Sequence, residues 1–153
     1  MRIVILFGSE MGTAEAAADV IAGELAAHDV SLYDMGEFDV ADLDAAALHI
    51  MVCSTYGDGE LPTNAEPFAA ALERERPALD GLRFAVFGLG DSVYGETFNR
   101  GGEIIAEQLN ALGAVQLGEH ARHDASTEVK VRDLAGEWAR GLRALPSFEL
   151  ATA

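Results

Sequence analysis

The sequence predicts a single α/β domain built on a parallel β-sheet that helices cover on both faces. Short apolar runs alternate with helical patterns along the whole chain, which is typical of parallel strands joined by helical crossovers. Half of the 153 residues are hydrophobic, which suits one domain with a substantial core. We place five strands in the sheet. We expect residues 1–146 to form the domain and 147–153 a C-terminal tail.

The first half of the chain supplies three of these strands. Arg2–Phe7 is an apolar run and is predicted as the first strand, and Thr13–Ala27 is predicted as a helix because apolar residues recur on one face. Val30–Tyr33 is a short second strand. Met35–Ala46 is acidic and irregular, with at most one helical turn. Leu48–Cys53 is apolar throughout, which indicates a third strand buried on both faces.

The second half repeats the alternation. In chain order we predict a helix at Asn64–Arg74, a strand at Arg83–Leu89 and a helix at Asn99–Leu112. The start of a fifth strand at Ala114–Leu117 and a last helix at Glu128–Leu142 follow. Asn64 is the expected cap of the first of these helices. The fifth strand has room to continue toward His123. Pro146 is expected to end the last helix, and the residues after it to fray.

The charge of the chain is strongly negative. The sequence carries 26 acidic and 10 basic residues, a formal net charge of −16. Such a chain is disfavoured as a partner of nucleic acid or of an anionic membrane. It suits docking on basic protein surfaces, although solubility or adaptation to high salt explains the same composition.

The single cysteine indicates a reducing compartment. Cys53 has no possible partner within the chain, so we expect a cytoplasmic protein without an intrachain disulfide. The N-terminal apolar run has five residues, which is short for a signal peptide. No stretch approaches the roughly 18 apolar residues of a membrane span.

The first strand ends in a loop of small and hydroxyl residues, Gly8–Thr13. A predicted helix follows, and the free N–H groups and dipole of a helix N-terminus favour a phosphate. No lysine or arginine lies between Gly8 and Glu15. We therefore predict a phosphate site whose donors are backbone N–H groups and the hydroxyls of Ser9 and Thr13.

Two more predicted strands run into glycine-rich loops, at residues 54–65 and 88–99, and each loop holds one tyrosine, Tyr56 or Tyr94. The carboxyl ends of parallel strands meet at one edge of a sheet, so we expect the three loops to lie together. Two tyrosines can enclose a flat aromatic ligand, and glycines let the backbone approach it. Each loop alone also fits an ordinary turn. The combination favours an aromatic ligand with a phosphate.

These three loops resemble those of the flavodoxin family and of the FMN domains of diflavin reductases. The turn Gly95–Phe98 and the pair Gly118-Glu119 are most similar to the short, MioC-type flavodoxins. The resemblance covers nearly the whole chain. It implies FMN as the cofactor and a flavodoxin-like three-layer sandwich with a five-stranded parallel sheet in the order 2-1-3-4-5.

The resemblance also implies a set of cofactor-binding residues. They are Ser9, Glu10, Met11, Gly12, Thr13, Ala14, Ser54, Thr55, Tyr56, Gly57, Asp58, Gly59, Gly88, Leu89, Gly90, Asp91, Tyr94, Phe98, Asn99 and Asp124. The first six would surround the phosphate, and the two tyrosines would lie on opposite faces of the flavin ring. The carbonyl of Gly57 would turn to accept a hydrogen bond from N5 of the reduced ring. Met11 departs from the threonine of many relatives.

The function implied by this resemblance is a low-potential one-electron carrier and not an enzyme. Such a carrier works between a flavodoxin- or ferredoxin-type reductase and an acceptor enzyme, and we expect a monomer that docks on basic redox proteins. No catalytic residues are predicted. Acidic residues near the ring, among them Asp58, Glu60 and Asp91, would lower the potential because they disfavour added negative charge.

The sequence allows four other interpretations. A flavin-dependent reductase of quinones or similar small molecules is the main alternative, but no G-x-G-x-x-G nucleotide motif follows the first strand. A flavin-binding module without redox partners would look the same. A signalling receiver needs an aspartate where Cys53-Ser54 stands. His120, His123 and Asp124 are too weak a pattern for a metal site, and none is predicted.

Overall fold

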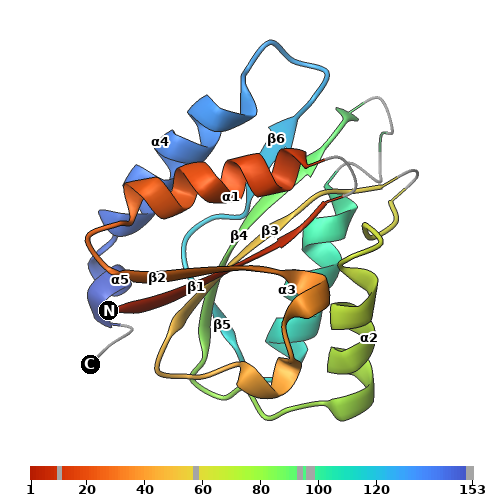
Figure 1. Ribbon diagram of the computed structural model, residues 1–153, viewed down its shortest axis with the longest axis vertical. Coiled ribbons are helices and arrows are strands. Elements are labelled where there is room, and N and C mark those ends of the chain that lie inside the picture. The colour runs from red at the N-terminus through yellow and green to blue at the C-terminus, as the bar shows by residue number, and fades with distance from the viewer. Residues whose placement is uncertain (10–11, 57–58, 93–94, 96–98, 151–153) are drawn as a thin grey trace.

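The computed structural model describes residues 1–9, 12–56, 59–92, 95 and 99–150, and it shows three layers with a parallel sheet in the middle (Figure 1). The strands are β1 (Arg2–Gly8), β2 (Asp29–Asp34), β3 (Leu48–Cys53), β4 (Arg83–Gly90), β5 (Val115–Gln116) and β6 (Ala121–Asp124). The helical elements are α1 (Thr13–Glu24), η1 (Met35–Glu37), η2 (Val40–Asp42), α2 (Glu66–Glu75), α3 (Arg100–Ala111), α4 (Val131–Arg143) and α5 (Pro146–Leu150). Helices α1, α4 and α5 cover one face of the sheet, and α2 and α3 cover the other.

The sheet has the predicted order, β2-β1-β3-β4-β5, and all pairs of named strands in it are parallel. The fifth position differs from the expectation of one strand, because two short strands share it. β5 pairs with Arg83 and Phe84 at the start of β4, and β6 pairs with residues 87–90 at its end. The chain leaves the sheet between them, where Leu117 is buried and Gly118 has a φ of 71°. The described sheet therefore has six strands.

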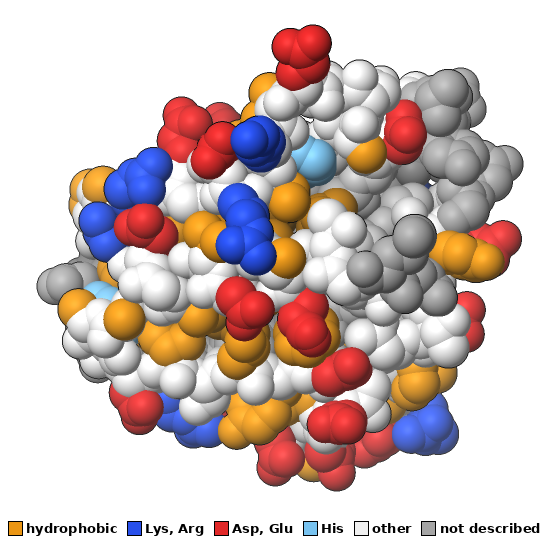
Figure 2. Space-filling view, turned by 45° about the horizontal axis from the view of Figure 1, so that its top comes forward, with side chains coloured by type: hydrophobic (Ala, Val, Ile, Leu, Met, Phe, Trp, Pro, Cys, Tyr) orange, Lys and Arg blue, Asp and Glu red, His pale blue; other side chains and the backbone are white. Residues whose placement is uncertain are grey.

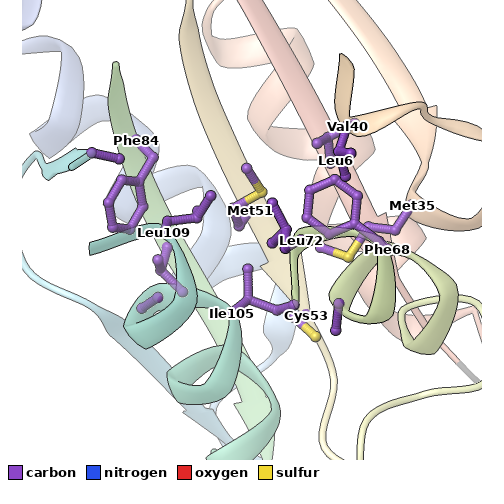
Figure 3. Packing of buried hydrophobic residues seen from close by; sticks show 14 of the residues in the cluster. Leu6, Met35, Val40, Met51, Cys53, Phe68, Leu72, Phe84, Ile105 and Leu109 are labelled. Carbon is purple, nitrogen blue, oxygen red and sulfur yellow. The ribbon is translucent and has the colours of Figure 1, made fainter. Parts of the chain in front are cut away.

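Two hydrophobic cores lie on the two faces of the sheet. On one face, Phe68 and Leu72 of α2 and Ile105 and Leu109 of α3 pack on the strands, as Figure 3 shows. On the other face, small residues of α1, among them Ala14, are fully buried and let this helix lie close to the sheet. Side chains of the central strands β1, β3 and β4 point to the two cores, largely in alternation, which is the arrangement expected for a sheet covered on both sides.

Several predicted helix boundaries are corrected by the structure. α1 ends at Glu24 and α4 begins at Val131, so both are shorter than predicted. α2 begins at Glu66, and Ala65 occupies its cap without a side-chain hydrogen bond. Asn64 is therefore not the cap of α2, and its side chain has another partner.

The C-terminal segment also differs from the prediction. Pro146 begins the short helix α5, and its rigid φ suits the first turn of a helix. Phe148 is 1% exposed and belongs to the core beneath α1 and α4. Its ring meets that of His28 edge to face, with the centroids 5.4 Å apart. The predicted tail from residue 147 therefore begins with residues that are packed rather than frayed.

The helices in the described ranges are short. The longest of them, α4, has 13 residues, whereas a helix that crosses a bilayer needs about 20. No helix among the described residues is both long enough and apolar enough to span a membrane.

Candidate cofactor site

The carboxyl ends of the three central strands meet at one edge of the sheet, as the sequence predicted (Figure 1). Gly8 at the end of β1 lies opposite Cys53 at the end of β3, and Cys53 lies opposite Gly88 in β4. An added Cβ at Gly8 would lie 2.9 Å from the side chain of Ala65, which is closer than real Cβ contacts come. The backbone at this edge is therefore packed tightly, and the strand ends are fixed relative to one another.

The loop after β1 is held by its own serine. The Ser9 hydroxyl accepts hydrogen bonds from the backbone N–H of Gly12 at 2.8 Å and of Ala14 at 3.4 Å. The backbone N–H of Ser9 donates to Oδ1 of Asn64 at 2.8 Å. A hydroxyl that accepts two bonds still has its one O–H to donate, so Ser9 keeps a donor for a ligand oxygen.

The N-terminus of α1 is open to solvent. Gly12 and Thr13 are both exposed, and Gly12 has a φ of 83° with no atom within 4 Å of the place where a side chain would stand. The side chain of Ala14 is fully buried, so only its backbone can face a ligand. The two hydroxyls, the helix dipole and the first-turn N–H groups that Ser9 does not accept are together suited to a phosphate.

The loop after β3 contains a tight hairpin. Tyr56 and Glu60 exchange backbone hydrogen bonds of 2.7 and 2.8 Å, and Gly59 between them has a φ of 93°. Tyr56 is 52% exposed, so one face of its ring is available to a flat ligand.

The start of the same loop lies against α3. The hydroxyl of Thr55 accepts the backbone N–H of Gly101 at 3.0 Å. An added Cβ at Gly101 would overlap the carbonyl oxygen of Ser54. Ser54 and Thr55 therefore hold the beginning of α3 beside the loop after β3.

The end of β4 and the residue before α3 are buried. Leu89 is 4% exposed and its side chain lies in the core, so only its backbone can face a ligand. Asn99 is completely buried, with a φ of 60°. Gly88 lies beneath Asn99 and His120, and an added Cβ would be 2.5 and 2.7 Å from their Oδ1 and Nε2 atoms. Gly90 and Asp91 are half-buried.

Asp124 lies at the end of β6, opposite Gly90 of β4. Its Oδ1 accepts the backbone N–H of Ser92 at 3.0 Å, and the backbone N–H and hydroxyl of Ser126 at 2.9 and 2.7 Å. These hydrogen bonds, that from the Ser92 backbone first, hold the pKa of the carboxyl well below its usual range.

Some predicted contacts lie outside the described residues. They are Glu10, Met11, Gly57, Asp58, Tyr94 and Phe98. Their predicted roles, including the second tyrosine and the turning carbonyl, stay predictions. The other fourteen predicted residues lie on or beside the three strand-end loops and at the end of β6.

Sequence reasoning missed several residues that hold this edge together. Asn64 binds the loop after β1, Ser92 and Ser126 bind Asp124 beside the loop after β4, and His120 lies against Gly88 of β4. Asn64 stands just before a helix, a position that favours a cap, so the sequence pattern predicted the wrong partner. The link from Ser92 to Asp124 joins residues 32 positions apart and leaves no local signal.

The surface shows the acidic character of the chain. In Figure 2, acidic side chains gather over the lower part of the visible face, and basic ones stand mainly above and to the left of them. Several arginines are paired; Arg100, for example, binds Glu107 at 2.9 and 3.0 Å. In the described ranges, no group of three or more His, Cys, Asp or Glu side chains is placed to hold a metal ion.

A doubly wound parallel sheet with a phosphate-type loop at its strand ends defines a nucleotide-binding α/β protein. Comparison with known proteins narrows this class. A family model for flavodoxins matches residues 5–142. The chain belongs to the flavodoxin family.

Individual relatives agree with this assignment. The chain is 30% identical over 136 residues to the protein MioC of Escherichia coli K12, covering 89% of this chain and 92% of MioC. It is 36% identical over 125 residues to human NADPH–cytochrome P450 reductase, covering 77% of this chain and 18% of the reductase. The crystal structure of oxidised flavodoxin 2 from Bacillus cereus superposes with a TM-score of 0.80 at 34% identity, covering 93% of this chain and 97% of that one.

The family points to FMN as the cofactor, and the described residues fit it. An uncharged set of N–H and hydroxyl donors at a helix N-terminus suits the phosphate. The exposed ring of Tyr56 suits a flavin face. The buried, glycine-lined strand ends leave backbone groups to face the ring edge.

Proposed function

We propose that this protein is a low-potential, one-electron FMN carrier that moves electrons from a reductase to an acceptor protein. The observation that carries the proposal is the meeting of three strand-end loops at one edge, with the open N-terminus of α1 on one side and the exposed Tyr56 on the other. FMN, when bound, supplies the one- and two-electron redox chemistry.

The loop after β1 would hold the phosphate without a cation. Ser9 and Thr13 would donate hydroxyl hydrogens, and N–H groups in the first turn of α1 that Ser9 does not accept would complete the set. Because Ser9 already accepts the N–H groups of Gly12 and Ala14, the loop is shaped before a ligand arrives. A pre-shaped loop loses less conformational entropy on binding.

The loops after β3 and β4 would hold the ring. Tyr56 would stack on one face, and Tyr94 on the other. The backbone hydrogen bonds between Tyr56 and Glu60 hold the two sides of this loop together, which supports the proposed hydrogen bond from N5 to the Gly57 carbonyl. The backbone of Gly90 and Asp91 would face the pyrimidine edge.

Negative charge near the ring would keep the potential low. At an effective dielectric constant of ~20, one negative charge ~10 Å away opposes an added electron by about 1.7 kcal/mol, or about 70 mV. Glu60 is exposed beside the hairpin and Asp91 follows β4. Since solvent screens exposed charges, we expect each to contribute less than this figure.

The partners would be redox proteins with basic surfaces. The net charge of −16 supports electrostatic docking, which speeds encounter with a basic partner. We place the protein in the cytoplasm and treat it as a monomer, on the basis of its single, buried cysteine and its charge.

Binding is tested with the cofactor-free protein and two ligands. We expect FMN to bind at least tenfold more tightly than riboflavin, because only FMN has the phosphate. Fluorescence quenching of each flavin measures both dissociation constants. A protein that does not bind FMN, or binds both flavins equally, would contradict the proposed site.

Electron transfer is tested with the FMN-loaded protein. We expect electrochemically reduced protein to pass electrons to a basic haem protein such as cytochrome c, at a rate that falls steeply as salt rises. We expect the protein alone not to oxidise NADH or NADPH. Rapid oxidation of either, with turnover of a quinone, would favour the enzyme alternative instead.

A further inference from the structure

The segment between β4 and α3 is attached to β6 at both of its ends. At the β4 end, the backbone N–H of Ser92 donates to Oδ1 of Asp124 at 3.0 Å. At the α3 end, Nδ2 of Asn99 donates to the backbone carbonyl of His123 at 3.3 Å. His123 and Asp124 are consecutive residues of β6, which lies beside the end of β4 in Figure 1. One short strand therefore holds both ends of residues 91–99.

β6 is itself held in place. It pairs with the last four residues of β4, and the N–H of Ala125 continues the ladder to the carbonyl of Gly90 at 2.8 Å. Nε2 of His123 donates to the carbonyl of Val129 at 2.8 Å, so the chain after β6 folds back on it. The His123 side chain is buried. Because β6 is held on both sides, it can fix the position of the chain ends that are hydrogen-bonded to it.

Asp124 concentrates its contacts on that segment. Its Oδ1 accepts one bond from Ser92 and two from Ser126, and the two serine hydroxyls lie 2.8 Å apart. A carboxylate that accepts three hydrogen bonds is strongly held in its charged form. Losing this oxygen would leave the N–H of Ser92 without its acceptor.

Asn99 has little freedom to compensate. It is fully buried in a left-handed conformation that few side chains adopt. Its Oδ1 lies over Gly88, where no side chain can be added without a clash. Among the described residues this Oδ1 has no hydrogen-bond partner. The bond from Nδ2 to the His123 carbonyl is therefore the polar contact that holds the Asn99 side chain among them.

We propose that β6 fixes the two ends of the flavin-binding segment between β4 and α3, at Ser92 and Asn99, and that Asp124 is a positioning residue that acts through Ser92. This inference rests on the proposed function, since it assigns to Asp124 an indirect role in holding the flavin ring. The carboxylate fixes the backbone at residues 91 and 92, where the pyrimidine edge would lie. Asp124 thereby contributes to FMN affinity by ordering the loop.

The test compares three variants. Asp124→Ala removes the acceptor, whereas Asp124→Asn keeps an Oδ1 that can accept the Ser92 N–H. Asp19→Asn is the matched control, because it makes the same charge change at an exposed position of α1. We expect Asp124→Ala to weaken FMN binding about tenfold or more, and the other two variants to stay within about threefold of the wild type.

A second measurement needs no flavin. Amide hydrogen exchange of the cofactor-free proteins reports the order of residues 91–99 directly. We expect Asp124→Ala to speed exchange in this segment at least tenfold, while the segments in β1 and α2 exchange as in the wild type. Faster exchange everywhere would mean general destabilisation and would overturn the proposal.

The outcomes separate this inference from the proposed function. If the wild type fails to bind FMN, the proposed function fails, and exchange in residues 91–99 still tests the role of Asp124. If the wild type binds FMN and Asp124→Ala binds it equally well with unchanged exchange, the positioning role is wrong. If Asp124→Asn binds FMN as weakly as Asp124→Ala while exchange is unchanged in both, the loss of charge and not of loop order explains the weaker binding. That result also overturns the positioning role.

Discussion

The two ends of the same sheet are built in opposite ways. At the carboxyl end, glycines at 8, 88 and 101 let backbone and polar groups approach closely, and hydrogen bonds connect loops that are far apart in sequence. At the amino end, large apolar side chains such as Phe148 close the core, and His49 is buried without a hydrogen-bond partner among the described residues. The carboxyl end of the sheet therefore carries the proposed binding groups, whereas the amino end carries buried side chains that stabilise the fold.

The largest expected effect is at the amino end. Phe148→Ala removes a fully buried ring from the core beneath α1 and α4, so we expect a loss of roughly 3 kcal/mol in the free energy of unfolding. Urea denaturation measures it. Val115→Ala, at an exposed position of β5, is the control and should stay within about 0.5 kcal/mol. A small effect of Phe148→Ala would restore the expectation of a loose tail.

The buried histidine makes the amino end sensitive to acid. Burial lowers the pKa of His49 from 6.5 to about 4, against the opposing attraction of Asp44. The folded state therefore favours the neutral ring, so stability is full above pH 6.5 and is lost as the pH falls toward 4. The loss is roughly 3 kcal/mol for this group.

Replacing the histidine checks that pH dependence. We expect His49→Leu to lose less stability than the wild type between pH 7 and pH 4, with the difference close to the figure above. Denaturation curves at several pH values give both slopes. Equal slopes for the two proteins would show that His49 is not the group that titrates.

Much of the fold could be predicted from sequence because its elements are local. Apolar periodicity located β1 to β5 and the four long helices, and the strand order followed from the family resemblance. The split of the fifth strand was not predicted, because Leu117 is apolar and its N–H still bonds to the Phe84 carbonyl at 2.6 Å. Gly118, with a φ of 71°, then interrupts the strand before β6. The burial of Phe148 was not predicted, because Pro146 can either end a helix or occupy the first turn of a new one.

The candidate site was predicted in part for the same reason. Gly8 ends β1, Ser9 follows it, and Tyr56 lies three residues after the end of β3, so their place at the sheet edge could be inferred. The supports of the site could not, because Asn64 and Asp124 reach backbone groups 55 and 32 residues away. Contacts of that kind depend on the folded arrangement and leave no periodic trace in the sequence.

At the carboxyl end, a substitution of Gly101 tests the energetic cost of disturbing the close backbone contact. Gly101→Ala brings a Cβ onto the Ser54 carbonyl, so we expect a loss of about 1–3 kcal/mol in stability. Gly141→Ala in α4 meets open space and should gain about 0.5–1 kcal/mol through helix propensity. Thermal or urea unfolding of both variants measures the contrast. Similar values for the two would mean that the close approach at Gly101 has no energetic cost.

The smallest expected effect is on binding alone. Ser9→Ala removes a hydroxyl and the acceptor of two loop N–H groups, so we expect FMN affinity to fall about tenfold, or ~1.4 kcal/mol, with riboflavin little changed. Ser31→Ala in β2 is the control. Fluorescence titration gives the dissociation constants. Equal losses for FMN and riboflavin would place the phosphate elsewhere.

The single cysteine of the chain lies at the carboxyl end of the sheet, where its reactivity can report the opening of the structure over time. Cys53 is fully buried at the end of β3, its thiol points to the Ser54 carbonyl at 3.4 Å, and burial raises its pKa to about 12. Such a thiol reacts with alkylating reagents only when the surrounding structure opens. The alkylation rate of Cys53 therefore measures how often this edge of the sheet opens, and no added label is needed.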